Sequence, residues 1–450
     1  MSDFRSLIET IFELEEHHDL FERRVFGVYY WSVLRNAVAG DAARAAGLFT
    51  AVEVGGESAG LRKIPCLLRT GLVAFVRFLN RRNSLKRDTG LAILSHRVKK
   101  EVDGAYAERF TLDMLRRWDA SAPVVLDQAD TSASRFSRIS GRAVVPVEWI
   151  YIIGKIFGYA VGWVFALHPE MRRLDQCMAV LGVSGMRRRY HRKLAKFLCE
   201  ERLFAAVFRR TRLEELLLTV SYGERSIIAA ARESGIRVRE YQHNPISPWS
   251  LGYAMPHGGD MPYAPDILMV YGAAWHTAAP YPARMWVETV PKDKDADANC
   301  VLPSAAQRDP DAVVLLSQPD VAADMAMAAR ILAQRCPDCR VYYRPHPLDG
   351  WSKGLLQDFS ATNLHINEGN SVDAILSLCT FQVGAFSTAL IRGLQLGCRT
   401  IVLDVPGSEH FDWIVQRGDA IRVSDAEDLA ERWRHAPAAA EPSSYRTPVR

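Results

Sequence analysis

The chain has 450 residues, a formal net charge of +4 at pH 7 and an apolar fraction of 48%. This length exceeds what one hydrophobic core usually organises, so two domains are expected. The composition is that of a soluble globular protein, which argues against disordered and fibrous classes. The net charge is too small to indicate a nucleic-acid-binding protein by itself.

The start of the chain is acidic and amphipathic, without the pattern of a secretory leader, and the eight cysteines are scattered. We therefore expect a reducing, cytoplasmic setting with mostly buried thiols. Residues 4–48 have the periodicity of helices, and Trp31, Leu34 and Val38 continue one apolar face.

Two stretches, 62–100 and 187–196, are rich in Lys and Arg. The apolar run 64–80 carries Arg69 and Arg77, so it is too short and too charged to span a bilayer. It fits either a helix that lies on a membrane or a buried helix of the first domain. The basic blocks fit an anionic surface, lipid or nucleic acid, or a solvated helix face.

From Leu91 the pattern changes to strands that alternate with helices. The apolar segment 149–167 is interrupted by Lys155, which favours a buried helix over a membrane span. Long helical patterns continue through 187–210. Strands are predicted at 91–96, 122–128, 215–222, 238–243 and 266–272, and helices at 108–118 and 223–235.

Residues 291–311 are polar and without periodicity, which predicts a linker. Asp293, Asp295 and Asp297 alternate like calcium ligands, but the loop glycine and the closing glutamate of a calcium loop are absent. Cys336 and Cys339 precede a strand, so we interpret them as a turn and not a metal or redox site. A second alternation follows, with strands at 313–318, 341–345, 381–387 and 399–404 and helices at 321–335, 371–379, 387–396 and 425–434.

Strands and helices that alternate at this spacing predict parallel, doubly wound sheets. The predicted class is α/β, with two Rossmann-like domains that face a central cleft and an extra N-terminal helical region. The first domain would span 1–290 with a helical extension over 1–90. The linker is 291–311, and the second domain is 312–450.

An arginine and a histidine end one strand of the second domain. Val341, Tyr342 and Tyr343 form that strand, and the prolines that follow Arg344 and His346 end it. Open α/β sheets bind ligands at the carboxyl ends of their strands. A cation beside an imidazole suits an anion, most plausibly a phosphate, although a polar strand end beside a turn has the same appearance.

Neighbouring loops of the second domain add groups of the same kind. Ser387 or Thr388 would cap the helix that follows, whose N-terminus attracts anions. Glu368 opens another helix and is placed to bind ribose hydroxyls or to act as a cap. Ser317 and Gln318, after the first strand of this domain, would reach the same ligand.

A strand of the first domain is also followed by a histidine. Gln242, His243 and Asn244 follow it, and we expect them at the strand ends that face the cleft. His96 and Arg97 begin a polar loop after the first strand of the domain and are expected on the same side. A lone histidine in such a place is also compatible with a purely structural role.

Five segments resemble bacterial surface-polysaccharide glycosyltransferases, which build capsule or lipopolysaccharide glycans on a GT-B scaffold. More distantly, the His-Pro and Ser/Thr motifs are similar to those of polysialyltransferases and teichoic-acid polymerases. The segments are residues 26–35, 95–106, 236–253, 344–347 and 386–397.

This resemblance implies roles for individual residues. His346, with Arg344, and the Ser/Thr pair at 387–388 would hold the donor phosphate. An acidic-acidic-glycine motif supplies the general base in the polysialyltransferase-like families, and Asp103 is the acidic residue that remains of it here. His243 would correspond to the catalytically important histidine of the polymerases, although Asn244 replaces the glycine that usually follows.

The sequence thus predicts a metal-independent glycosyltransferase without a cofactor, in which Asp103 or His243 is the base. The donor would be a CMP-sugar such as Kdo or sialic acid, with a nucleotide-diphosphate sugar as the alternative. The acceptor would be a surface glycan or lipid-linked glycan at the cytoplasmic face of the inner membrane, and no nucleic acid would be bound. Alternatives are a non-catalytic carbohydrate-binding or assembly subunit and a sugar-nucleotide epimerase.

Overall fold

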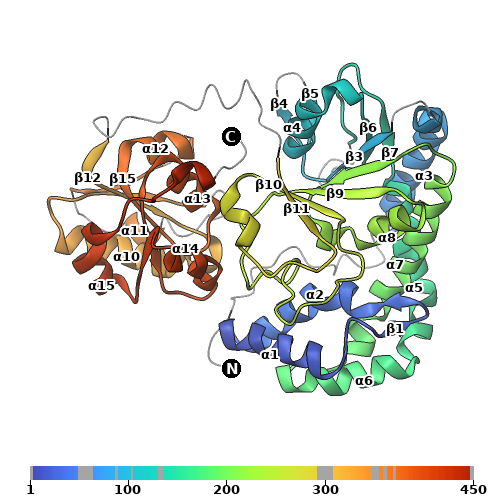
Figure 1. The fold of residues 1–450 in the computed structure, drawn as a ribbon, viewed down its shortest axis with the longest axis horizontal. Helices are drawn as coiled ribbons and strands as arrows, with labels where there is room; N and C mark the ends of the chain where they lie inside the picture. Colours follow the sequence, from blue (N-terminus) through green and yellow to red (C-terminus); the bar gives the residue numbers. More distant parts are fainter. Residues whose placement is uncertain are drawn as a thin grey trace.

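The computed structural model has two α/β domains, and each is built on one large sheet (Figure 1). The segment between the last strand of the first sheet and residue 308 lies outside the described residues. The structure describes residues 4–48, 64–86, 90–102, 105–129, 135–290, 308–346, 354–357, 362–367 and 371–445.

The first domain is built on a parallel sheet of seven strands in the order β11-β10-β9-β8-β3-β6-β7. Chain order reverses between β3 and β8, which are neighbours and parallel. This is the doubly wound arrangement, whose ligands bind where the order reverses. The strands are β3 (Leu91–Ser95), β6 (Val124–Asp127), β7 (Val144–Pro146), β8 (Glu215–Leu218), β9 (Arg237–Tyr241), β10 (Ile267–Val270) and β11 (Trp286–Thr289).

Helices cover this sheet because its central strands are buried on both faces. The longest helices, α5 and α7, pack along each other. The helices are α1 (Phe4–His17), α2 (Tyr30–Ala45), α3 (Ile64–Arg81), α4 (Arg109–Arg117), α5 (Glu148–Ala166), α6 (Pro169–Met178), α7 (Met186–Phe208) and α8 (Arg225–Glu233).

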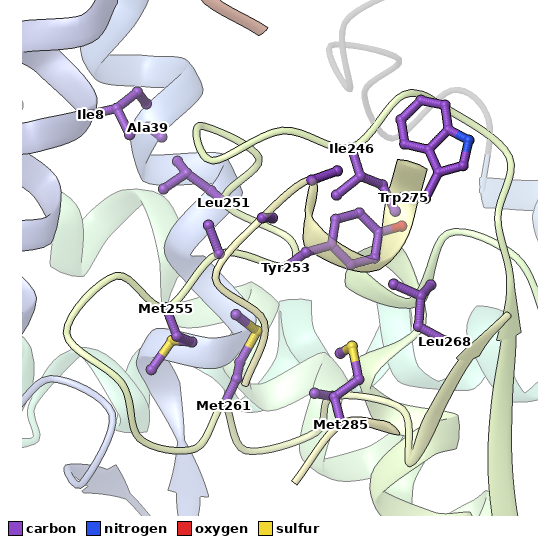
Figure 2. Close-up of a cluster of buried hydrophobic side chains, with 14 of the residues drawn as sticks. Ile8, Ala39, Ile246, Leu251, Tyr253, Met255, Met261, Leu268, Trp275 and Met285 are labelled. Atoms are coloured by element: carbon purple, nitrogen blue, oxygen red, sulfur yellow. The ribbon is translucent and has the colours of Figure 1, made fainter. Parts of the chain in front are cut away.

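The N-terminal helices are part of the first domain, as a buried arginine shows. Arg35 of α2 pairs with Glu15 of α1 and donates to the carbonyl oxygens of Leu251 and Ala254, at 2.6 and 2.8 Å. Figure 2 shows Ile8 and other side chains of these helices in one apolar cluster with the loop that follows β9. A buried guanidinium must be satisfied in this way, so the helices and the loop hold each other in place.

The second domain has a parallel sheet of six strands in the order β14-β13-β12-β15-β16-β17. Its order reverses between β12 and β15, so it too is doubly wound. The two topologies confirm the predicted class of two Rossmann-like domains. The strands are β12 (Asp309–Leu316), β13 (Arg340–Arg344), β14 (Leu364–Ile366), β15 (Cys379–Gly384), β16 (Arg399–Leu403) and β17 (Ala420–Val423).

Helices lie on both faces of the second sheet (Figure 1). The interpretation of Cys336 and Cys339 as a turn agrees with the structure, since the amide of Cys339 donates to the carbonyl oxygen of Cys336 at 3.0 Å. The helices are α10 (Ala322–Arg335), α11 (Gly354–Gln357), α12 (Val372–Leu378), α13 (Thr388–Leu396), α14 (Asp412–Gln416) and α15 (Ala426–Arg432).

Local differences from the sequence expectations occur where the pattern is short. The polar loop after β3 contains an antiparallel hairpin, β4 (Lys100–Val102) and β5 (Ala105–Ala107). A second small ribbon, β1 (Arg24–Val25) with β2 (Val28–Tyr29), separates the first two helices. Strand β12 begins inside the stretch predicted as linker, and the rest of that stretch, 291–307, lies outside the described residues.

The two domains touch through loops at the carboxyl ends of their strands. Trp275 follows β10 and packs against Trp413, which follows β16, with ring centroids 5.2 Å apart. Arg5 of α1 forms an ion pair with Asp412. The carboxyl edges of both sheets are therefore on the side where the domains meet.

Candidate functional site

One end of β13 carries Arg344, whose side chain is half-buried. Its Nη1 donates to the side-chain oxygen of Asn367 at 2.8 Å, so one arm of the guanidinium is fixed. The amide of Ser317 donates to the carbonyl oxygen of Arg344 at 3.0 Å, and the hydroxyl of Tyr343 donates to the Ser317 hydroxyl at 2.9 Å. These bonds connect the ends of β12 and β13 and hold the cation at the edge of the sheet.

His346 lies two residues beyond β13 and is half-buried. Desolvation raises the pKa of the Asp320 carboxyl, and the nearby His346 imidazole opposes that shift. Asp320 follows the end of β12, and Gln318 precedes it on the same loop. His346 is thus directed toward the loop after β12, the central strand at the reversal of chain order.

The N-terminus of α13 lies at the other side of this reversal. Ser387 is its cap, with a hydroxyl that accepts from the amide of Ala389 at 3.2 Å, and Thr388 is the first helical residue. Gly384 precedes the cap, and a Cβ there would lie 3.0 Å from Leu390 Cδ1. A helix N-terminus that follows a tight strand end attracts anions. The predicted capping is confirmed for Ser387.

Two predicted site residues, Asp103 and Glu368, lie outside the described residues. The roles proposed for them stay predictions. The other predicted positions are described, and the structure places them at the carboxyl edges of the two sheets.

His96 and Arg97 follow β3 and are held by groups that the sequence did not single out. Nε2 of His96 donates to the carbonyl oxygen of Thr219 at 2.9 Å, and Nδ1 faces Glu224 at 3.7 Å. Arg97 lies 3.6 Å from Glu148. The hydrogen bond of Nε2 fixes the ring of His96, which favours a positioning role.

A buried network completes this edge. The carboxylate of Glu224 accepts hydrogen bonds from the side-chain amide of Gln128 at 2.9 Å and from the hydroxyl of Tyr151 at 2.6 Å. Lys99 forms a fully buried ion pair with Asp127 at 2.8 Å. These contacts fix the loop after β3, so the polar residues at its start have defined positions.

His243 follows β9 and lies between aromatic rings. The ring centroids of Phe110 and Tyr222 are 6.3 and 6.2 Å from that of the imidazole. Burial, with a smaller contribution from His96, lowers the pKa of His243 to about 4. Its Nδ1 atom is buried and has no hydrogen-bond partner within the described part of the chain. His243 is therefore an unprotonated imidazole at neutral pH.

Gln242 and Asn244, the neighbours of His243 in the sequence, differ in role. Gln242 is buried, donates to the carbonyl oxygen of Asn244 at 3.1 Å and accepts from the amide of Tyr271 at 3.1 Å. It therefore connects β9 to β10. Asn244 is exposed.

A cavity of about 350 Å³ lies at the junction of the domains. His243 and Asn244 line it together with Trp249 of the same loop, side chains of α1 and α2, and His410 of the second domain. Sequence reasoning missed His410 and Trp249. Only the glycine before the short 408–411 turn could have drawn attention to that loop.

The loop with His410 connects this cavity to the second-domain edge. A Cβ on Gly407 would lie 2.9 Å from the ring of Phe386, the residue before the α13 cap. Gly407 has a φ of +94°, a conformation that favours glycine. The carboxyl edge of the second sheet and the cavity are therefore separated by one loop.

Within the described residues, no group of three or more His, Cys, Asp or Glu side chains is arranged to hold a metal ion. The groups that can stabilise an anion are Arg344, His346 and the α13 N-terminus. Those that can handle a proton or bind hydroxyls are His243, Asn244 and Trp249.

No family model and no curated protein matches the sequence. Solved structures that resemble it include the glycosyltransferase of kitacinnamycin, at 13% identity over 79% of this chain and 91% of that one, with a TM-score of 0.44. MurG of Acinetobacter baumannii matches at 12% identity over 56% and 74%, with a TM-score of 0.38. A Listeria monocytogenes protein assigned as a UDP-N-acetylglucosamine 2-epimerase matches at 13% identity over 62% and 82%, with a TM-score of 0.39.

Proposed function

We propose that this protein is a glycosyltransferase of the GT-B type that moves a sugar from a nucleotide-activated donor to a bacterial surface glycan. The observation that carries the proposal is the placement of two doubly wound switch points on the edges where the domains meet. Switch points are where such sheets bind ligands, so a donor on one and an acceptor on the other would adjoin.

The donor would lie on the second domain, with its phosphate against Arg344, His346 and the N-terminus of α13. These groups supply a fixed cation, an imidazole and the positive end of a helix dipole, which together stabilise negative charge. A CMP-sugar such as Kdo or sialic acid is favoured by the motif resemblance, and a nucleotide-diphosphate sugar is the second choice.

The acceptor sugar would enter the cavity between the domains. Trp249 offers an indole ring and Asn244 offers an amide, since both side chains line the cavity. Aromatic and amide side chains of this kind can contact the faces and hydroxyls of a pyranose. The N-terminal helices would shape the acceptor site, because they form one wall of the cavity.

In the reaction an acceptor hydroxyl attacks the anomeric carbon of the donor. The new C–O bond forms as the bond to the leaving phosphate oxygen breaks, and its electron pair leaves with the nucleotide. We assign the hydroxyl proton to His243, since its imidazole is unprotonated at neutral pH and lines the cavity. Asp103 is the alternative base. Charge on the departing phosphate would be stabilised by Arg344 and His346.

A thermal-shift comparison of CMP, CDP, UDP and GDP tests the donor site. A nucleotide at about a hundred times its Kd stabilises the folded state by about 2.7 kcal/mol. We expect one nucleotide to raise the Tm of the wild type and to have no effect on Arg344→Ala. If none raises the Tm, or if the variant responds equally, the proposed donor site is wrong.

Product analysis separates the function from its alternatives. Transfer to a glycan or hydrolysis of the donor would exclude a non-catalytic binding subunit. Release of an isomerised sugar nucleotide without any acceptor would instead indicate an epimerase. Because the acceptor we propose is lipid-linked, the proposal also places the protein in the cytoplasm, at the inner face of the inner membrane.

A further inference from the structure

Along its middle turns, helix α5 carries glycines on the side that packs against α7 and large apolar side chains on the side that faces outward. Its small side is turned inward: Gly154, Gly158 and Gly162 pack against α7. A Cβ on Gly158 would lie 2.7 Å from the carbonyl oxygen of Arg192, and one on Gly162 would lie 2.9 Å from the ring of His191. Close approach of the two backbones therefore occupies the face that normally carries large apolar side chains.

Five large apolar side chains on α5 or directly after it are on the outward face. Ile153, Ile156, Tyr159, Trp163 and Leu167 are all exposed, and Trp163 and Leu167 are 61% exposed. Their spacing places them along one side of the helix. A continuous exposed apolar stripe of this length marks an interaction surface and not scattered surface residues.

Helix α3 extends this stripe. A Cβ on Gly71 would lie 3.2 Å from the Ile152 side chain, and the ring of Phe75 lies 5.3 Å from that of Trp149, so α3 packs beside the first half of α5. Five apolar side chains of α3 are also exposed: Leu72, Val73, Phe75, Val76 and Leu79. We call the outward stripes of α3 and α5 together the α3–α5 face.

Exposed basic residues lie on α3 itself and on α7, which packs against α5. Residues 64–86 contain no Asp or Glu. On the other side the Arg192 guanidinium of α7 lies 4.6 Å above the ring of Tyr159. The exposed cations are Arg69, Arg77, Arg81 and Arg82 on α3 and its following turn, and Arg188, Arg192 and Lys193 on α7. An apolar surface with a cationic border is complementary to anionic lipid headgroups above acyl chains.

We propose that the α3–α5 face docks the protein on a bilayer that contains anionic lipid, with its apolar side chains in the headgroup–acyl boundary. In the described residues α5 is the one helix long and apolar enough to cross a membrane, but 44% of that stretch is buried inside the protein. The buried part of α5 packs against α7, α3 and the core of the first domain, so the helix lies on the bilayer and does not span it. The proposal complements the proposed function through the lipid-linked acceptor, but it is tested without any sugar transfer.

Vesicle binding of the full chain provides the test. The wild type is expected to sediment with phosphatidylcholine vesicles that contain phosphatidylglycerol, less with phosphatidylcholine alone, and less at high ionic strength. Trp163→Glu/Ile156→Glu should weaken binding by about tenfold or more, because two charges would enter the boundary region. Arg82→Gln/Arg192→Gln should weaken it by about fivefold per residue, and only with anionic vesicles.

Matched controls come from exposed residues elsewhere on the molecule. Trp286 and Met327 are 67% and 50% exposed and belong to β11 and α10. Trp286→Glu/Met327→Glu should bind vesicles like the wild type. Trp163→Phe should keep binding but reduce the quenching of tryptophan fluorescence by brominated lipid. The thermal shift with nucleotide should be unchanged in all these variants, which separates failure of docking from failure of the proposed function.

Three outcomes would contradict the proposal that the α3–α5 face docks on a membrane. If the wild type ignores anionic vesicles at low ionic strength, the proposal is overturned. A dimer in sedimentation velocity that Trp163→Glu dissociates, without vesicle binding, would assign the face to a second copy of the chain. Equal loss of vesicle binding in Trp163→Glu/Ile156→Glu and in the Trp286→Glu/Met327→Glu control would also overturn it.

Discussion

The hydroxyl oxygen of Ser247 lies 2.7 Å from Nδ1 of His410 and joins the first domain to the second. Burial lowers the pKa of His410 to about 4, so at neutral pH the imidazole is uncharged and shares a hydrogen bond with the Ser247 hydroxyl. The ring of Phe4 also packs on this imidazole, at 5.2 Å between centroids. Protonation of His410 would place a charge between the domains.

Stability should therefore fall in mild acid. The pKa values of His410 and His243 are both lowered to about 4 in the folded protein, from an ordinary value of 6.5. The unfolded chain thus binds more protons between these values. The stabilisation is complete above pH 6.5 and is lost as the pH falls toward 4, by about 2 kcal/mol per histidine at pH 5.

The check is the unfolding free energy of the wild type and of His410→Gln across this pH range. The variant should show a shallower decline, because one of the two histidines no longer titrates. Parallel profiles for the two proteins would contradict the assignment.

If the carboxyl end of β13 binds the donor phosphate, substitutions at the two ends of this strand should differ in their effect on activity. His346→Ala should lower kcat about a hundredfold, because charge stabilisation on the leaving phosphate is lost. Arg344→Ala should weaken nucleotide binding as well. Arg340→Ala is the matched control, since Arg340 is at the other end of the same strand and pairs with Asp309. Equal effects at both ends would mean that the strand, and not its carboxyl edge, is responsible.

Proton transfer can be assigned by comparing two substitutions. His243→Asn should lower the transfer rate by about 10²–10⁴-fold with donor affinity intact, as expected for a lost general base. Asp103→Asn should have a smaller effect if His243 is the base. Rates and nucleotide affinities measured separately decide the matter: the reverse order of effects would make Asp103 the base and His243 a positioning residue.

The buried pair of Arg35 and Glu15 should be needed for stability of the first domain. Arg35→Met leaves the carboxylate of Glu15 buried without its partner, which should cost about 3–5 kcal/mol. Arg35→Met/Glu15→Leu should recover a large part of this loss. Denaturant unfolding gives both values, and a double variant no more stable than the single one would show that the carboxylate is not the source of the cost.

Replacing glycine by alanine should change the stability in opposite directions at two positions, because only one of them lies in the contact between α5 and α7. Gly158→Ala would place a Cβ 2.7 Å from a backbone oxygen and should destabilise by about 1–3 kcal/mol. Gly40 of α2 has only Arg44 Nη1 within 4 Å, at 3.9 Å. Gly40→Ala should be neutral or stabilising by up to about 1 kcal/mol. Thermal unfolding of both variants provides the measurement. If Gly158→Ala is as stable as Gly40→Ala, the contact between α5 and α7 tolerates a Cβ and the prediction is wrong.

The sheets were largely predictable because buried parallel strands are continuous apolar runs. Residues 91–95 and 312–316 are buried without interruption and are evident from sequence. The missed strands of the two sheets, β7, β11, β14 and β17, have three or four residues, and β11 and β14 have no buried position. Such edge strands lack the pattern on which sequence reasoning depends.

The candidate site was predictable only where a residue ends a strand. Arg344, His243 and Ser387 follow apolar runs, so their placement at the sheet edges could be inferred. His410 belongs to a short turn without periodicity, and its partner Ser247 is 163 residues away in the chain. Contacts of that kind arise from the packing of whole domains, and no local pattern reports them.

The buried contact of Arg35 also determines when the N-terminal helices can fold during synthesis. Arg35 is 216 residues from Leu251, whose carbonyl oxygen it binds. At about 5–20 residues per second, a ribosome needs on the order of 10–40 s to deliver that partner. For this time the buried guanidinium of Arg35 lacks the carbonyl oxygens that it binds in the complete first domain. Nascent chains should therefore depend on chaperones most strongly while the first domain is being synthesised, and that dependence should end soon after the loop beyond β9 has left the ribosome.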